Sequence, residues 1–294
     1  MASGLDYAPL WSWIVKRERV RVRKEFGAPP PWTDDPILAT YRFCNVRRED
    51  DRGTVWVRKH VREPYASDQT LWLMLCICRI INWPDTLEGL ILSDAWPSVE
   101  GFKPAQIAVA LNARRARGDK VYTGAYMIPA PHAKGADKQA YVAETMIGGL
   151  WGRRDEWPVA VRGASGLTLT LEGRHRWIMK TIGWGNFLAY QAIVDMRFTG
   201  ILDRADDVST WAAAGPGTIR GLNRLHGRAT DAGISQEQAL KEMREIYRIV
   251  HGETGVHMDF SDVPNVLCET DKYLRVQRGE GKPRALYVHG RGSS

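Results

Sequence analysis

The sequence predicts a mainly α-helical protein that contains helix-hairpin-helix elements. Two observations lead to this prediction. Apolar residues recur every three or four positions through most of the chain, which is typical of helices with one buried face. Two glycine turns, at residues 183–185 and 215–217, each lead directly into such a helical pattern. With 294 residues, the chain is long enough to bury a sizeable core in one or two closely packed lobes.

The predicted elements follow one another with short connections. Helices are expected over residues 10–26, 34–43, 54–61, 68–82, 84–92, 137–150, 167–182, 186–198, 218–225, 235–250 and 261–276. Residues 120–127 fit a short strand or a loop. Ser235 and Gln238 predict a capping box at the start of their helix. We expect a basic helix and proline turn over 1–33, a helical domain of two packed lobes over 34–284 and a loosely ordered tail over 285–294.

The chain is basic, with a formal net charge of +7 and a sequence pI near 9.3, which gives mild support to a polyanionic partner. The helix expected at 10–26 concentrates this charge. Its basic residues are Lys16, Arg17, Arg19, Arg21, Arg23 and Lys24. They either contact a phosphate backbone or form a solvated face. Most of the 12 tryptophans are expected in the core.

The cysteines and the apolar segments indicate a protein of a reducing cytoplasm. Cys44, Cys76, Cys78 and Cys268 are too few and too scattered for a disulfide framework, and we see no signal peptide. The apolar run over 71–81 is interrupted by Arg79 and is far shorter than the roughly 20 residues of a membrane span. It is therefore predicted to be a core helix.

The two glycine turns point to DNA. A glycine turn before a helix presents backbone N–H groups and the positive end of the helix to a phosphate. In the first turn the predicted DNA-binding residues are Gly183, Gly185 and Asn186. In the second turn they are Gly215, Gly217, Thr218, Arg220, Asn223 and Arg224. Pairing of the second set with surface acids is the alternative.

Several kinds of site are excluded. A P-loop needs a first glycine where Val276 stands, and its lysine is followed by a hydroxyl residue, whereas Lys282 is followed by Pro283. The histidines form no i,i+4 pair with a neighbouring acid, so no metal site is predicted. Simple base excision fits poorly because Asp195 follows the first turn by only ten residues and no four-cysteine cluster is present.

Four blocks carry a resemblance to a known family. They are residues 41–50 (YRFCNVRRED), 183–191 with Asp195 (GWGNFLAYQ), 215–224 (GPGTIRGLNR) and 267–273 (LCETDKY). In these blocks the chain resembles the phage proteins described as alpha-glutamyl/putrescinyl thymine pyrophosphorylases. It is also similar to the amino acid:DNA transferases of thymine hypermodification and to the helical domain of 5-hydroxymethyluracil DNA kinase.

The resemblance implies a helix-hairpin-helix fold like that of DNA glycosylases, used to decorate a flipped base rather than to excise it. In that pathway a separate P-loop kinase pyrophosphorylates 5-hydroxymethyluracil, and a transferase then replaces the pyrophosphate with an amine. Glycine is the favoured amine, with other amino acids or a polyamine left open. The implied partners are double-stranded phage DNA carrying the modified thymine, the free amino acid or polyamine and the upstream DNA kinase, in the cytoplasm of an infected bacterium, with no membrane.

Such a reaction needs a base for the ammonium and cations for the leaving group. The predicted catalytic residues are Asp195 or Asp271 as general base, Lys272 as a cation and Glu269 beside it. Because residues i and i+2 of a helix diverge, only one of Glu269 and Asp271 is expected to face a given site. The predicted substrate-binding residues are Arg42, Asn45, Arg48, Asp50, Tyr190 and Gln191.

Packing roles are the alternative for several of these residues, above all for Tyr190 and for the amides of Asn45 and Gln191. No cofactor is certain, and a divalent cation such as Mg²⁺ is left open as an aid to pyrophosphate departure. Two other functions also stay open at this point. These alternatives to the transferase are a DNA glycosylase that shares the fold and a DNA-binding partner of the kinase without chemistry of its own.

Overall fold

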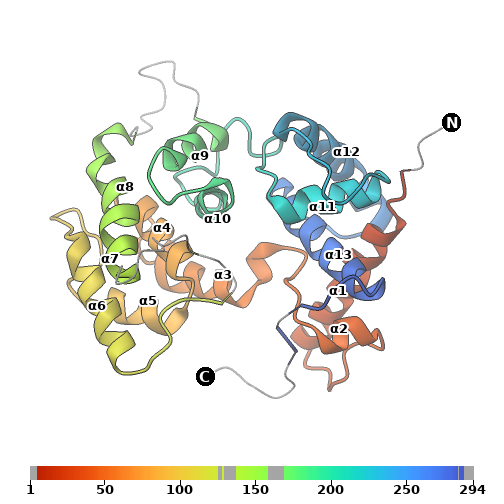
Figure 1. The fold of residues 1–294 in the computed structure, drawn as a ribbon, viewed down its shortest axis with the longest axis horizontal. Coiled ribbons are helices and arrows are strands. Elements are labelled where there is room, and N and C mark those ends of the chain that lie inside the picture. Colours follow the sequence, from red (N-terminus) through yellow and green to blue (C-terminus); the bar gives the residue numbers. More distant parts are fainter. Residues whose placement is uncertain (1–4, 125–127, 129–136, 158–168, 284, 288–294) are drawn as a thin grey trace. The chain divides into compact units, whose positions relative to one another are not determined.

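The computed structural model describes residues 5–124, 128, 137–157, 169–283 and 285–287 (Figure 1). The protein is mainly helical, as predicted, and β pairing among these residues is limited to two isolated bridges. The chain divides into two compact units. Unit 1 comprises residues 1–51 and 209–294, and unit 2 comprises residues 52–208.

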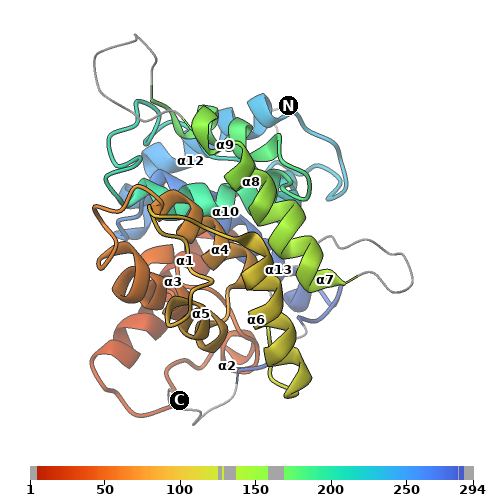
Figure 2. The same ribbon diagram turned by 90° about the vertical axis from the view of Figure 1, so that its left-hand side faces the viewer.

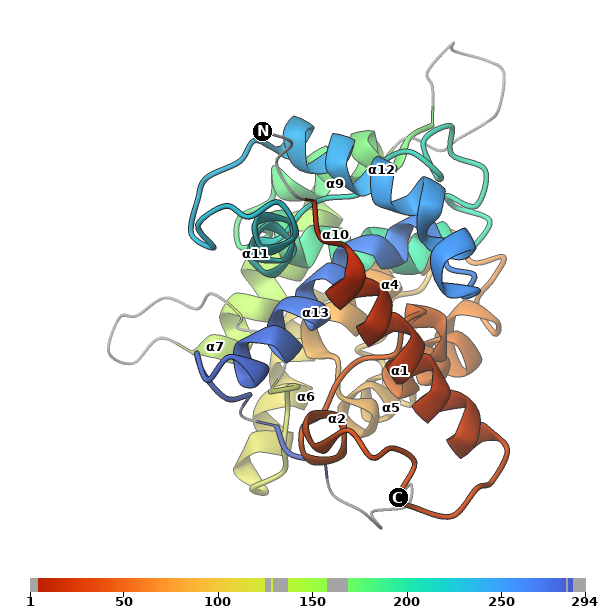
Figure 3. The ribbon, with the colours of Figure 1, turned by 90° about the vertical axis from the view of Figure 1, so that its right-hand side faces the viewer.

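Unit 1 is built from two distant parts of the chain. Its helices are α1 (Ala8–Glu25), α2 (Pro36–Thr40), α11 (Pro216–Leu225), α12 (Gln236–Thr254) and α13 (Val263–Gln277), with 3₁₀ turns at Arg48–Asp50 and Phe260–Asp262 (Figure 3). Helix α13 is the centre of the unit, because it contacts α1, α2, α11 and α12. The segment 1–33, expected as a separate element, therefore supplies α1 to the packing of unit 1.

Helix α1 places one arginine on its buried face. Leu10, Trp13, Ile14 and Val20 recur at helical spacing and are buried. Arg17 lies on the same stripe and is buried with them. Arg17 is therefore not part of a solvated face, and it does not lie on the exposed surface of α1 that a nucleic-acid backbone would meet.

Two glycines allow α11 and α13 to pack closely. A Cβ atom at Gly217 would lie 2.3 Å from the Sγ atom of Cys268, and one at Gly221 would lie 2.4 Å from the carbonyl oxygen of Leu267. Both distances are far below van der Waals contact. Because the two glycines are four residues apart, they share one face of α11. The helices therefore meet along a seam that admits no side chain at these positions.

Unit 2 is a bundle of short helices (Figure 2). They are α3 (Arg52–Val57), α4 (Leu71–Ile81), α5 (Pro84–Ile91), α6 (Pro104–Ala116), α7 (Lys138–Ala140), α8 (Gly148–Gly152), α9 (Leu171–Met179) and α10 (Asn186–Arg197). Two π-helical turns, Arg58–Arg62 and Tyr141–Ile147, and a 3₁₀ turn, Arg154–Glu156, complete it. The second π-helical turn joins α7 and α8 into one rod, against which α6 packs.

Helix α4 is the core of unit 2. All of its residues are buried, including Cys76, Cys78 and Arg79, and it ends at Asn82 in the left-handed conformation with φ 45°. This confirms the prediction of a core helix. Helix α10 packs directly against α4.

The first glycine turn joins α9 to α10, as predicted. Gly183 has φ 88°, a conformation that favours glycine, and a Cβ atom there would lie 2.6 Å from the Cγ atom of Met146. Gly185 is the N-cap of α10 and has open space where a Cβ atom would project. The turn is anchored by Trp184, whose indole N–H donates to the carbonyl oxygen of Met146 at 3.0 Å.

Most predicted helices are confirmed, with differences of a few residues at their ends, but α6 was not predicted. Its buried residues are only Ile107, Ala108 and Leu111, which is too few to give a clear apolar stripe in the sequence. The helix expected at 34–43 stops at Thr40, because Tyr41 is extended and pairs with Leu286.

Other local predictions hold only in part. Ser235 accepts a hydrogen bond from the backbone N–H of Gln238, but the Gln238 side chain donates to Glu242, so the capping box is not closed. Residues 120–124 form no strand, and residues 125–127 of that prediction lie outside the described part of the chain. In the expected tail, residues 285–287 run antiparallel to residues 40–42.

Candidate functional site

A polar cluster in unit 1 joins the loop over residues 42–51 to one face of α13. A carboxylate oxygen of Glu269 accepts the backbone N–H of Cys44 at 3.0 Å and pairs with Lys272 Nζ at 2.6 Å. The same ammonium lies 4.6 Å from the centroid of the Phe43 ring. Glu269 is buried, whereas Lys272 is partly exposed. The cluster therefore presents a cation whose position is fixed by a buried acid.

Arg17 ties the same loop to α1. Its Nε atom donates to the carbonyl oxygen of Cys44 at 3.0 Å, and its Nη2 atom donates to the side chain of Asn45. The amide nitrogen of that side chain donates to the carbonyl oxygen of Asp50 at 2.7 Å. The Asn45 side chain is thus part of the loop's own hydrogen bonding. This agrees with the packing alternative for Asn45.

Asp51 is the titratable group of the cluster. It is partly exposed and accepts the backbone N–H of Asn45 at 2.8 Å. Burial raises the pKa of Asp51 to about 6, against the opposing effect of this hydrogen bond and of the nearby Arg48 and Arg17. A carboxylate with that pKa accepts and releases a proton near neutral pH.

Asp262 lies behind the cluster and holds the start of the 3₁₀ turn at Arg48–Asp50. One of its oxygens accepts the backbone N–H of Arg48 at 2.9 Å, and the other accepts that of Asp259 at 2.9 Å. Burial raises the pKa of Asp262 to about 7. Both of its oxygens serve the backbone, so its role is structural. Arg48, predicted to bind substrate, is thus held through its backbone N–H, and its side chain is buried.

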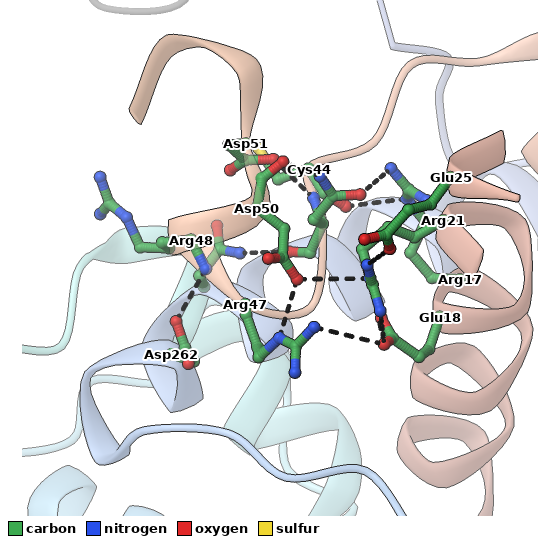
Figure 4. A network of polar contacts seen from close by, with 12 residues as sticks. Arg17, Glu18, Arg21, Glu25, Cys44, Arg47, Arg48, Asp50, Asp51 and Asp262 are labelled. Carbon is green, nitrogen blue, oxygen red and sulfur yellow. Dashed lines mark hydrogen bonds and ion pairs between the residues drawn. The ribbon is translucent and has the colours of Figure 1, made fainter. Parts of the chain in front are cut away.

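Asp50 belongs to a separate network between this loop and α1. It pairs with Arg47 Nε at 2.8 Å and with Arg21 Nε at 3.3 Å, and Arg21 also binds Glu18 and Glu25 (Figure 4). Asp50 stays a predicted substrate-binding residue, but its side chain is occupied by two arginines in this structure. The neighbouring Asp51, which the sequence analysis did not select, lies in the Arg17 cluster instead.

Asp271 faces away from this cluster. Its buried carboxylate accepts from Arg224 Nε at 2.7 Å and from Arg220 Nε at 2.9 Å, both on α11, and Arg275 Nε lies 3.7 Å away. The divergence predicted for the pair Glu269 and Asp271 is confirmed. Asp271 thus pairs two helices, a structural role for a residue that was predicted as a general base.

Asp195 has a similar environment in unit 2. Its carboxylate is fully buried and forms a two-point ion pair with Arg79 of α4, whose guanidinium also donates to Thr54 Oγ1 at 3.2 Å. Tyr190 and Gln191, on the same helix α10, are buried as well. This burial agrees with the packing alternative for Tyr190 and Gln191, and it leaves Asp195 without contact to solvent.

The first glycine turn exposes apolar and basic side chains. Ile182 is 71% exposed, Phe187 and Met179 are partly exposed, and Lys180 is at the surface. A shallow hollow follows the turn from Met179 to Gly185. Gly183, Gly185 and Asn186 at the start of α10 are exposed or partly exposed, and their contact with DNA stays a prediction.

The second glycine turn carries the other side chains that were predicted to contact DNA. Thr218 is buried and donates to the carbonyl oxygen of Pro264 at 3.0 Å, and Asn223 is buried and donates to that of Ala232 at 2.9 Å. Arg224 is buried against Asp271 and Glu280. These three side chains are engaged within the protein in this structure, and their contact with DNA stays a prediction. Of the side chains predicted there, Arg220 keeps a partly exposed guanidinium.

Arg17 and Asp51 were missed as site residues. The available signal for Arg17 was its position on the apolar stripe of α1, where a charged residue needs buried partners. Asp51 gave no signal, because the block that carries the resemblance ends at Asp50. Arg42, a predicted residue, is exposed at the edge of the loop.

The described residues offer neither a cluster of metal ligands nor a helix that could span a membrane. No group of three or more His, Cys, Asp and Glu side chains in the described ranges is arranged to hold a metal ion. No helix in the described part of the chain combines the length and the apolar character needed to cross a bilayer.

Comparison with known proteins then identifies the family. The family model described as the helical domain of 5-hmdU DNA kinase matches residues 6–283. The chain belongs to this family. A 5-hmdU DNA kinase of Bacillus phage SP10 is 34% identical over 122 residues, which cover 39% of this chain but only 18% of the kinase. No solved structure matches. The match to the 5-hmdU DNA kinase helical domain family thus includes residues of both units.

Proposed function

We propose that the protein is a transferase of thymine hypermodification that replaces the pyrophosphate of a pyrophosphorylated 5-hydroxymethyluracil in phage DNA with an amine. Membership of the 5-hmdU DNA kinase helical domain family supports the modified base as substrate. The observation that carries the proposal is the cluster of Asp51, Glu269, Lys272 and Arg17, which combines a proton acceptor with cations.

In this reaction the amine nitrogen attacks the exocyclic methylene carbon of the base. A C–N bond forms, the C–O bond to pyrophosphate breaks, and the ammonium loses a proton to a base. We assign the base role to Asp51, because its pKa of about 6 suits proton transfer near neutral pH. Asp195 and Asp271, the first candidates, are fully buried and engaged by arginines. Lys272, oriented by Glu269, is assigned to the developing negative charge.

The fold proposed for this function is a helix-hairpin-helix fold of the DNA glycosylase type. The order of the elements, helix α9 followed by the glycine turn and helix α10, supports this fold. The turn offers backbone N–H groups and an exposed Lys180 beside the apolar Ile182. Duplex DNA is the proposed partner of this turn. Extrusion of the base would bring the target carbon within reach of protein side chains.

The test uses duplex DNA with pyrophosphorylated 5-hydroxymethyluracil, incubated with the protein and a pool of amino acids and polyamines. Nucleoside digestion and mass spectrometry then look for a nucleoside in which the amine has replaced the pyrophosphate, with glycine as the favoured donor. Parallel reactions with Mg²⁺ and with EDTA test the divalent cation. An Asp51→Asn variant that is folded should lose at least 100-fold in rate. An unchanged nucleoside in every reaction would contradict the proposal.

A second candidate is a DNA-binding partner of a DNA kinase, without chemistry of its own. It is favoured by the match to a protein named as a kinase, of which this chain spans only 18% of the length. In that case the protein binds duplex DNA and leaves the pyrophosphorylated base intact, and Asp51→Asn has no effect. A DNA glycosylase would instead release the free base, which the same mass spectrometry detects.

A further inference from the structure

A second polar site in unit 1 is centred on Lys24, near the end of α1. The Lys24 ammonium lies 4.2 Å from the ring centroid of Tyr287 and 4.7 Å from that of Trp32. The two rings meet edge to face, with centroids 6.0 Å apart. Lys24 is therefore held between two aromatic walls.

Both walls are fixed in place by hydrogen bonds. The indole N–H of Trp32 donates to the carbonyl oxygen of Ala28 at 2.7 Å, and Arg23 donates to the carbonyl oxygen of Trp32 at 2.9 Å. The backbone N–H of Tyr287 donates to Thr40 at 2.8 Å. The site is thus preformed rather than made by loose surface side chains.

Arg42 enters the same site from the loop. Its backbone N–H donates to the carbonyl oxygen of Ala285 at 3.1 Å, two residues before Tyr287. Its guanidinium has no ion pair or hydrogen bond with any residue that the structure describes, and the Lys24 ammonium likewise has no carboxylate partner there.

Arg17 adds a third cation on the same side of α1, since residues seven apart share a face of a helix. Its side chain is buried, and its Nη1 atom has no hydrogen-bond acceptor among the described residues. A buried donor without an acceptor is costly and is normally satisfied by water or a ligand.

The three cations act on one another. Burial, together with the charges of Arg17 and Arg42, lowers the pKa of Lys24 to about 8. The same two arginines act on the Tyr287 hydroxyl, whose pKa is raised by burial. Asp51, Glu269 and Glu18 act on Arg17 from the side of the loop. The positive charges of Arg17, Lys24 and Arg42 still repel one another, and a bound anion relieves that repulsion.

We propose that Arg17, Lys24 and Arg42, between the rings of Trp32 and Tyr287, form a binding site for pyrophosphate. Guanidinium groups bind phosphoryl oxygens at two points, and an ammonium group adds a compact charge. The aromatic walls exclude water and strengthen these contacts. The choice of pyrophosphate over another phosphoryl anion rests on the proposed function, in which it is the leaving group.

Isothermal titration calorimetry of the full chain with inorganic pyrophosphate tests the site without DNA. Lys24→Gln and Arg42→Gln should each weaken binding roughly tenfold, which is the effect of one charge-assisted hydrogen bond. Arg19→Gln is the matched control, because Arg19 is exposed on another face of α1 and the variant loses the same charge. It should change the affinity by less than about twofold. Thermal melts of all variants establish that they are folded.

The same variants separate pyrophosphate from the phosphates of DNA. Binding of an unmodified duplex, measured by fluorescence anisotropy, should be nearly unchanged in Lys24→Gln. Absence of pyrophosphate binding to the wild type, an equal loss in Arg19→Gln, or a loss of duplex binding without a loss of pyrophosphate binding would each overturn the inference.

The outcome is also distinct from that of the transferase test. Pyrophosphate binding that depends on Lys24 and Arg42, in a protein that transfers no amine, supports the site and contradicts the proposed function. Transfer activity that is unchanged in Lys24→Gln and Arg42→Gln supports the function and overturns the site.

Discussion

Substitutions in the ion pair between Arg79 and Asp195 distinguish a structural role of Asp195 from a catalytic role. The two side chains are 3% and 0% exposed, and two hydrogen bonds join them. In Asp195→Asn the side chain keeps its volume but loses its charge, so the buried guanidinium of Arg79 loses its counter-ion. Breaking a buried pair from one side costs about 3–5 kcal/mol of folding free energy.

Thermal unfolding followed by circular dichroism measures this loss. The melting temperature should fall by roughly 6–20 °C, since each kcal/mol shifts it by 2–4 °C in a domain of this size. Replacing both partners, in Arg79→Met with Asp195→Leu, should recover most of the stability, because no unpaired charge is left buried. Asp203→Asn, at an exposed acid of the same unit, is the control. An Asp195→Asn protein with wild-type stability and no transferase activity would refute the structural assignment.

Three further results are expected. Because burial raises the folded-state pKa of Asp51 to about 6 from 3.8, the wild type should lose about 2 kcal/mol relative to Asp51→Asn as the pH rises from 4.5 to 7.5. Urea unfolding at pH 4.5 and 7.5 checks this, and parallel curves would contradict it. Gly221→Ala should destabilise by about 1–3 kcal/mol through its clash with α13, whereas Gly200→Ala, with open space at its Cβ, should melt like the wild type. Lys180→Gln should weaken duplex binding and lower the slope of log affinity against log salt by about one, and an unchanged slope in anisotropy titrations would exclude a phosphate contact.

The helices were largely predictable from the sequence, because apolar periodicity is a local signal. Helix α4 and the turn between α9 and α10 follow directly from residues that are close together in the chain. The divergence of Glu269 and Asp271 was also predictable, since helix geometry alone determines it. Helix α6 was not, because it buries only three small or aliphatic side chains.

The site was less predictable, because its contacts join distant residues. Arg17 meets the 42–51 loop, and that loop meets Glu269 more than 200 residues later. The second glycine turn shows a different difficulty. A glycine serves either a close phosphate or a close helix, and the sequence pattern is the same in both cases. Only the position of Gly217 against Cys268 distinguishes the two.

Unit 1 combines residues 1–51 with residues 209–294, while unit 2 is one continuous stretch between them. This arrangement imposes an order on folding during synthesis. Helix α1 leaves the ribosome early, but the helices that pack against it, α12 and α13, are translated more than 200 residues later. Unit 2 is complete well before that point. The apolar face of α1 therefore waits uncovered on the nascent chain, and it is the segment where we expect a chaperone to bind while translation proceeds.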